Sequence, residues 1–562
     1  MSRERVDVLI VGSGFGGAVT AYRLAELYAA AGVDPGRILV LERGARRGHT
    51  GFAQSMHIEH LAGVYELIQG QGAQIVVANT LGGGSALYLA ASLRAPAETF
   101  ERRDRRPGDG PPRRMWPAAI SRRSLDPYYR RAELALRVRR PTWEEVSKSG
   151  GLWAAVLDAA GHTCDRVPLA INPDRCVNAK WCHTGCIFGA KNTLFTNYLA
   201  SAERLGVRVR TQAQAHCVRQ VASRPYRYAV TVHPVKDSGW PDVLRGYEIE
   251  CKVLVLAAGA MNTPQILLRS RLLLPSLSRQ LGKHVGVNGD HVAAIEFDPR
   301  RVRDVLGLPG YADFHKGKPI TTMTYDFFAG RPGARHDGTR FTIQEIFLSP
   351  LTNMLYDDGR APAGEPSWWG LAKKEAIARW AIRIELLAMV EDTNDGELTG
   401  IPPVLPPTGG AIRPSPGPVA IGLLDYRFSE QSRRVRAAAD AAIERIAKRR
   451  GLGRFMKLTQ TEGAYAAHPL GGCRMADSPD LGVTDDGGAV YGYEGLYCID
   501  SSVIPTSLGV NPSLTIAAIA ERAAERLVRR GAALGLPAVP EGFAPGIPDE
   551  IVGERVVPAP AG

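Results

Sequence analysis

The feature that most constrains the fold is a run of glycines set between a short apolar strand and a helical segment near the N-terminus. Residues 6–11 are almost entirely apolar and predict a buried strand, residues 18–31 predict a helix, and residues 38–41 predict a second strand. The turn between the first strand and the helix contains Gly12, Gly14, Phe15, Gly16 and Gly17. Strand, glycine turn, helix and strand in this order predict a βαβ unit and a parallel sheet.

The spacing of these glycines is that of a dinucleotide-binding turn. In a G-x-G-x-x-G segment that opens a helix, backbone N–H groups and the helix dipole can face a pyrophosphate. Glu42 follows the second strand, where a carboxylate can accept hydrogen bonds from a ribose diol. The alternative is a tight turn in an unrelated α/β domain with a glutamate on its surface. The motif does not separate NAD from FAD.

Further segments extend this architecture along the chain. A second glycine turn, which could approach a flat ring or a phosphate, contains Gly82, Gly83, Gly84 and Ser85. Residues 252–257 predict another buried strand, whereas residues 300–450 show aromatic and β-branched alternation with a Pro/Gly-rich interruption at 402–418, which predicts a second domain. Residues 430–450 predict a long helix.

The net charge of +12 raises the question of a polyanionic partner. The arginines are scattered, and their densest cluster, at 102–114, lies among Pro and Gly without an aromatic platform, so we expect no nucleic-acid binding. The sequence shows neither a signal peptide nor an apolar run long enough to span a bilayer, so we expect a cytoplasmic protein, with peripheral membrane contact still open.

Two polar residues near the C-terminal end are candidates for catalysis. His468 precedes a Pro-Leu-Gly-Gly turn that leaves room for a ligand, and imidazole titrates near neutrality, as a general base must. Asn511 precedes Pro512 and a helical segment that ends near Arg530, so it is also a candidate helix cap. A histidine held in a core turn and a plain N-cap are the alternatives.

Several separated segments resemble the glucose-methanol-choline (GMC) oxidoreductases, and among them the cholesterol oxidase branch. They include GAKNT at 189–193, AAGAMNTPQILLRS at 257–270, GVNGD at 286–290 and the block HPLGGC…GLYCIDSSVIPTSLGVNP…TIAAIAER after residue 467. The resemblance covers nearly the whole chain. It implies an α/β fold with a discontinuous FAD-binding domain (residues 1–110, 165–300 and 455–531), an α+β substrate-binding domain on an antiparallel sheet (111–164 and 301–454), and a Pro/Gly-rich tail (532–562).

The resemblance also implies roles for individual residues. It places Glu42 on the FAD ribose, the backbone of Val218 near the adenine, Asp500 near the ribityl and pyrophosphate groups, and the helix after Pro512 at the flavin. His468 becomes the catalytic base and Asn511 the ligand of the substrate oxygen. Glu345 aligns loosely with an acid above the flavin, where it would be a second proton acceptor or isomerisation base, although a glutamate on an exposed strand is the simpler interpretation. Tyr88 departs from the family, where asparagine is common.

Three cysteines, Cys176, Cys182 and Cys186, are close together in the sequence. A similar spacing in membrane-associated sugar dehydrogenases of the family ligates a 3Fe–4S cluster; with His183 as a fourth ligand the group would suit zinc, and three buried thiols are the third interpretation. The cluster would direct electrons to a protein partner, and its absence would leave oxygen or a small acceptor.

The expected reaction is oxidation of an alcohol to a carbonyl by base-assisted hydride transfer to flavin N5. A sterol or another hydrophobic alcohol is the first expectation, and a sugar, terpenoid or polyketide alcohol is the next. Hydroxynitrile lyases and light-driven decarboxylases share the fold and represent the non-redox alternative. Oligomeric state is not determined by the sequence.

Overall fold

A computed structural model of the chain describes residues 4–55, 57–104, 113–222, 224–237, 239–311, 317–328, 339–346, 370–371, 374, 378–399, 420–458, 464–552 and 555–557. The predicted Pro/Gly-rich interruption at 402–418 and part of the arginine cluster lie outside these residues.

The predicted βαβ unit is present. It consists of β1 (Glu4–Val11), α1 (Phe15–Ala30) and β2 (Ile38–Leu41), with β1 and β2 parallel from Val8 opposite Ile38 onward. Val8, Leu9 and Ile10 are fully buried on alternating faces, which explains the unbroken apolar run, because a parallel sheet is covered on both sides.

This unit belongs to a seven-stranded sheet in the order β6-β2-β1-β9-β8-β7, with β19 paired to β9. The pairs β2–β6, β1–β9 and β9–β19 are parallel, whereas β7, β8 and β9 form an antiparallel extension. The bounds are β6 Arg208–Arg210, β7 Ala213–Gln220, β8 Tyr228–Pro234, β9 Tyr247–Leu256 and β19 Leu496–Cys498. The predicted parallel FAD-binding architecture is thus confirmed.

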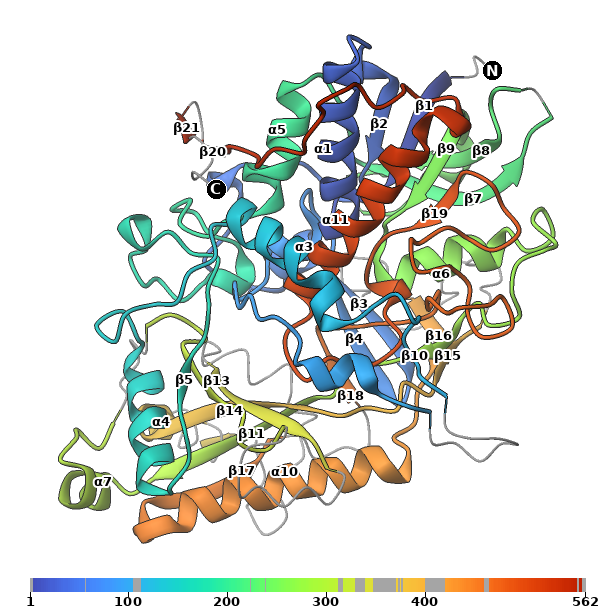
Figure 1. The fold of residues 1–562 in the computed structure, drawn as a ribbon. Helices are drawn as coiled ribbons and strands as arrows, with labels where there is room; N and C mark the ends of the chain where they lie inside the picture. The colour runs from blue at the N-terminus through green and yellow to red at the C-terminus, as the bar shows by residue number, and fades with distance from the viewer. Residues whose placement is uncertain are drawn as a thin grey trace.

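Helices gather beside the parallel sheet at the top of Figure 1. There α1 packs against α11 (Ser513–Arg530) and α5 (Tyr198–Arg204), and α11 packs against α3 (Arg122–Ala135). On another side, α6 (Gly259–Arg269) follows β9 and contacts β7.

The predicted second sheet is also confirmed: six strands in the order β17-β11-β14-β13-β12-β5 are antiparallel throughout. The strands are β5 Asp165–Arg166, β11 Asp290–Phe297, β12 Thr322–Thr324, β13 Phe341–Ile346, β14 Arg383–Val390 and β17 Gly453–Lys457. Its lower face in Figure 1 is covered by α4 (Lys148–Ala159) and α10 (Glu430–Lys448), with α7 (Pro299–Leu306) beside them.

A third sheet of six strands, in the order β10-β15-β16-β3-β4-β18, lies between the two. Its strands are β10 Lys283–Val285, β15 Gly396–Leu398, β16 Ala420–Asp425, β3 Tyr65–Gln71, β4 Ala73–Ala78 and β18 Ala464–Ala466, with α2 Ile58–Val64 before β3. A hairpin of β20 (Glu550–Val552) and β21 (Arg555–Val557) ends the described chain.

Strand membership differs in places from the predicted domain boundaries. The strand β11 lies before residue 300 but belongs to the antiparallel sheet. Its alternate side chains pack on α10 on one face of that sheet and join the core of the FAD-binding region on the other. The predicted 430–450 helix is α10, which ends at Lys448. Within the described residues, no helix is both long and apolar enough to cross a membrane.

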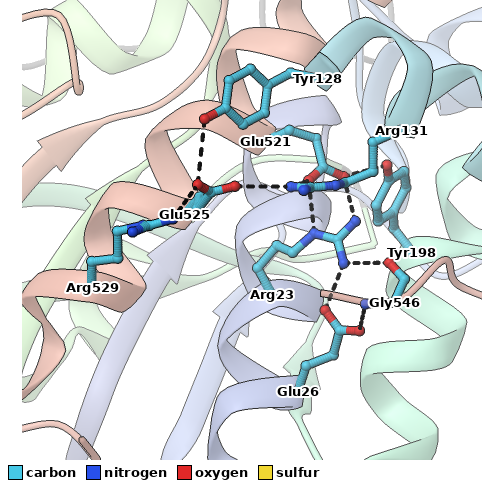
Figure 2. Close-up of polar contacts among 9 residues, drawn as sticks. All are labelled: Arg23, Glu26, Tyr128, Arg131, Tyr198, Glu521, Glu525, Arg529 and Gly546. Carbon is cyan, nitrogen blue, oxygen red and sulfur yellow. Dashed lines mark hydrogen bonds and ion pairs between the residues drawn. The ribbon is translucent and has the colours of Figure 1, made fainter. Parts of the chain in front are cut away.

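A buried ion pair ties the helices over the parallel sheet together (Figure 2). The Arg23 side chain of α1 is 2% exposed and donates from Nε and Nη2 to the two carboxylate oxygens of Glu521 of α11, at 2.7 and 2.8 Å. Tyr198 of α5 donates to Glu521 at 2.6 Å, and Arg131 of α3 lies 3.4 Å from it. Arg23 also donates to the carbonyl of Gly546, which fixes the C-terminal segment.

Replacing Arg23 by Met should lower the free energy of unfolding by about 3–5 kcal/mol, because Glu521 would remain buried without its bidentate partner. Denaturant unfolding measures the loss. The control is Arg529→Met, since the Arg529 side chain is 73% exposed beside Glu525 in the same network, and its loss should cost no more than about 1 kcal/mol. Equal effects of the two substitutions would contradict a dominant role for the buried pair.

Candidate active site

One cavity of about 950 Å³ runs from the glycine turn after β1 to the antiparallel sheet. Its wall includes residues of the two glycine turns, of the loop after β9, of the hairpin β3–β4, and of β11, β13 and β14. Two of the three predicted catalytic residues, His468 and Asn511, also line it, whereas Glu345 does not. The predicted nucleotide and catalytic sites therefore share one space.

The first glycine turn forms one end of this cavity. Gly12, Gly14, Phe15 and Gly16 line it, and nothing lies within 4 Å of where a Cβ of Gly14 would stand. A Cβ at Gly16 would lie 1.5 Å from the carbonyl oxygen of Ile499, and one at Gly17 would lie 1.9 Å from that of Gly12. Glycine is required at both positions because main chain packs on main chain there.

Ser13 joins this turn to two other parts of the site. Its hydroxyl donates to the carboxylate of Glu42 at 2.5 Å and accepts from the backbone N–H of Gly82 at 2.9 Å. Gly83 and Gly84 of the second turn line the cavity, whereas Ser85 holds the turn in place by accepting from the N–H of Leu194. Ser13 was not among the predicted site residues.

Two buried carboxylates line the cavity as predicted. Glu42 accepts from Ser13 and from the N–H of Gly44 at 2.7 Å. Asp500 accepts from the N–H of Gly259 at 2.8 Å and from the Thr263 hydroxyl at 2.6 Å. Burial raises the pKa of both groups, and these donors oppose the rise. Hydroxyl groups of a ribose or a ribityl chain could donate to both carboxylates.

Val218 is not brought to the cavity. Its N–H donates to the hydroxyl of Ser270 at 2.8 Å, and the cavity is lined instead by Ala213, Gln214 and Ala215 at the start of β7. A register shift between Ala215 and Cys217 breaks the regular alternation of this strand, and alignment to a motif does not reveal such a shift.

His468 is held by a carboxylate that the residue patterns did not assign. Its Nδ1 lies 2.8 and 2.9 Å from the two oxygens of Asp290, the first residue of β11. Because a carboxylate only accepts, Nδ1 carries the proton, and Nε2 of the neutral ring keeps its lone pair for a substrate. The motif at 286–290 contained Asp290, but only the fold places β11 beside His468.

Asn511 lies on the other side of the histidine ring. Its Nδ2 is 3.5 Å from His468 Nε2, and its Oδ1 is buried without a hydrogen-bond partner. The helix α11 begins at Ser513, with Pro512 before it, and Asn511 makes no capping bond. The predicted cap is therefore wrong, and the amide is available to a ligand. Pro512 and Ser513 also line the cavity, so α11 directs its positive end there.

Glu345 lies on the opposite face of the antiparallel sheet. It is fully buried and accepts from the hydroxyl of Ser149 on α4, so it is neither exposed nor above a cofactor. The neighbouring Ile346 lines the cavity instead, because successive strand residues point to opposite faces. The predicted second proton acceptor is thus absent from this position.

Aliphatic side chains line another part of the cavity that contains the His468–Asn511 pair. These residues come from three strands of the antiparallel sheet and the segment before β12: Val292, Ile320, Ile346 and Leu387. Tyr88, which replaces the asparagine common in the family, also lines the cavity, with its ring edge-on to Phe15 at 5.9 Å. None of the aliphatic residues was predicted, because each looks like an ordinary core position in its strand.

The three cysteines line one small separate cavity together with Lys191 and Lys318. All three are free thiols, and burial raises the pKa of Cys182 to about 12. Within the described part of the chain, no group of three or more His, Cys, Asp or Glu side chains is arranged to hold a metal ion. The arrangement therefore does not fit an iron–sulfur or zinc site.

The chain is similar to known proteins over most of its length. A family model described as GMC oxidoreductase matches residues 6–286, and a second with the same description matches residues 424–520. A cholesterol oxidase of Mycobacterium tuberculosis is 28% identical over 93% of this chain and 91% of its own length. Long-chain-alcohol oxidase FAO4B of Arabidopsis thaliana is 24% identical over 94% of this chain and 68% of its own.

Among solved structures, an FAD-dependent oxidoreductase from Chaetomium thermophilum is similar with a TM-score of 0.59 at 15% identity, covering 94% of this chain and all of the other. The protein belongs to the GMC oxidoreductase family. It is an FAD-dependent oxidoreductase acting on alcohols. The open face of Gly14, the carboxylates of Glu42 and Asp500 and the free amide oxygen of Asn511 fit that cofactor.

Replacing Asp290 by Asn should lower the rate of alcohol-dependent flavin reduction by about 10²-fold or more, because the histidine would lose the partner that fixes its tautomer. Anaerobic stopped-flow absorbance measures this rate. The control is Glu345→Gln, a buried carboxylate of the same sheet on its opposite face, which should leave the rate within about threefold. A rate that falls only in Glu345→Gln would contradict the assignment.

Purified protein should show the absorption of flavin alone, because the cysteines form no ligand set. Metal analysis should find iron far below one equivalent per chain, and the spectrum should lack the broad band near 400 nm. Stoichiometric iron that is lost in Cys182→Ser would reject this interpretation of the cysteine cavity.

Proposed function

We propose that this enzyme oxidises a hydrophobic alcohol, a sterol or a long-chain alcohol, to the corresponding carbonyl compound, with His468 as the base. The observation that carries the proposal is the His468 ring, held at Nδ1 by Asp290 and with only the Asn511 amide, at 3.5 Å, near Nε2, in a cavity that also has an aliphatic wall. Relatives named as a cholesterol oxidase and a long-chain-alcohol oxidase support this substrate class.

Some residues of the site would bind the cofactor, and others would orient the substrate or transfer its proton. Bound FAD would be held by the glycine turn, Glu42 and Asp500, and it supplies the hydride acceptor. His468 takes the hydroxyl proton at Nε2, and the Asn511 amide orients the substrate oxygen. Asp290 stabilises the imidazolium that results. A positioned base of this kind is worth about 10²–10⁴ in rate.

The aliphatic wall supports a hydrophobic substrate over a sugar. Val292, Ile320, Ile346 and Leu387 offer no hydrogen-bonding side-chain atom, so sugar hydroxyls buried against them would lose hydration without compensation. An apolar ring system or alkyl chain gains about 25 cal/mol for each Å² that it buries on the same wall. Oxygen is the acceptor we propose, as the oxidase names of these relatives suggest.

Replacing His468 by Ala should leave FAD bound and slow its reduction by cholesterol or a long-chain alcohol by about 10²–10⁴-fold. Flavin bleaching under argon measures the reaction, and peroxide formed on admitting air identifies the acceptor. His162→Ala is the matched control, because His162 also pairs with an aspartate, Asp326, but outside the cavity. Unimpaired bleaching in His468→Ala would reject the base.

The same measurement separates the non-redox alternative. A lyase or decarboxylase on this scaffold would convert its substrate without bleaching the flavin, whereas alcohol oxidation must bleach it. A panel of sterols, long-chain alcohols and sugars under argon would rank the substrate classes, and bleaching by sugars alone would overturn the hydrophobic assignment.

A further inference from the structure

Lys191, in the GAKNT segment, is a fully enclosed cation. It is 1% exposed, and its Nζ donates to the main-chain carbonyls of Ala86 at 2.7 Å, Tyr88 at 3.0 Å and Cys182 at 2.6 Å. An ammonium group has three hydrogens, so these bonds satisfy it completely.

In the part of the chain that the structure describes, no carboxylate balances this charge. No Asp or Glu in the described segments forms an ion pair with Lys191, and the ionisable groups that act on it are the thiols of Cys182 and Cys186. Burial lowers the pKa of Lys191 to about 8, which expresses the cost of keeping the charge away from water. A buried charge without a counter-ion is expensive, so carbonyl dipoles alone are an unusual solution.

The charge lies directly behind the wall of the cofactor cavity. Its Nζ is 5.4 Å from the centroid of the Tyr88 ring, and Tyr88 and Leu87 both line that cavity. The segment continues to Ala91, whose carbonyl accepts from the hydroxyl of Ser513, two residues after Asn511. Lys191 therefore stands behind the part of the cavity wall that Leu87 and Tyr88 form.

We propose that Lys191 places a fixed positive charge behind the wall formed by Leu87 and Tyr88, and that this charge favours the reduced, anionic form of the FAD that the cavity would hold. Its hydrogen bonds to Ala86 and Tyr88 also hold the turn that forms this wall. The loop with the three cysteines then has a structural role, because the main-chain carbonyl of Cys182 is one of the three acceptors that hold the ammonium group of Lys191 in place. The inference rests on the proposed function only in requiring FAD in this cavity.

The test separates the effect of the Lys191 charge from the effect of its hydrogen bonds in the FAD-loaded enzyme. Lys191→Gln keeps donors but removes the charge, and Lys191→Arg keeps the charge. Lys318→Gln is the control, because Lys318 lines the same cysteine cavity. Its Nζ donates to the main-chain carbonyl of Glu145 and to Oδ1 of Asn178, and not to Ala86 or Tyr88. The readouts are the midpoint potential of bound FAD and the dissociation constant of sulfite, which adds to oxidised flavin to give an anionic adduct.

We expect Lys191→Gln to weaken sulfite binding about tenfold and to lower the potential by about 30 mV, which is a tenfold change in the two-electron equilibrium. Lys191→Arg and Lys318→Gln should each stay within about threefold of wild type. If Lys191→Gln retains FAD poorly, the ratio of its dissociation constants for reduced and oxidised FAD gives the same change in midpoint potential.

Unchanged potential and sulfite affinity in Lys191→Gln would overturn the inference, as would equal shifts in Lys191→Gln and Lys191→Arg, which would show a purely structural role. Neither result would affect the proposed oxidation. That proposal would fail instead if wild-type enzyme with bound FAD were not bleached by any alcohol of the panel.

Discussion

The structure depends on the close contact of main chain with main chain around the first glycine turn. Gly16 touches the carbonyl of Ile499 and Gly17 that of Gly12, so the start of α1 lies directly on the loop after β19 and leaves no space for a side chain. This contact holds the N-terminus of α1 toward the cavity and brings in Asp500, the residue after Ile499. A segment from each end of the chain is thereby joined at the nucleotide site.

Around that contact, each buried charge of the site is stabilised in a different way. Glu42 and Asp500 receive hydrogen bonds from backbone N–H groups and hydroxyls, Asp290 is paired with His468, and Lys191 is enclosed by carbonyls. Burial raises the pKa of Glu42 and Asp500 and lowers that of Lys191, and the hydrogen bonds that the two carboxylates accept oppose their rise. The site is thus prepared electrostatically before any ligand enters.

Much of the site could be predicted from the chain itself. The turn at 12–17, Glu42, the turn at 82–85, His468 and Asp500 all depend on local spacing or on a distinctive block of sequence, and the structure gathers them around one cavity. The predictions that failed required tertiary information. Val218 does not line the cavity and donates its N–H to Ser270, and the Asn511 side chain lies beside His468 instead of capping α11.

The sequence by itself therefore determined the features that depend on periodicity and local spacing, which are the βαβ unit, the glycine turns and the family. It also supplied His468 as the candidate base. Only the tertiary structure decided which side chains face the substrate space, because a strand presents alternate residues to opposite faces and neighbouring strands set which face is which. Ile346 rather than Glu345 reached the cavity for this reason. Asp290 could join His468 only once two sheets, distant along the chain, had packed together.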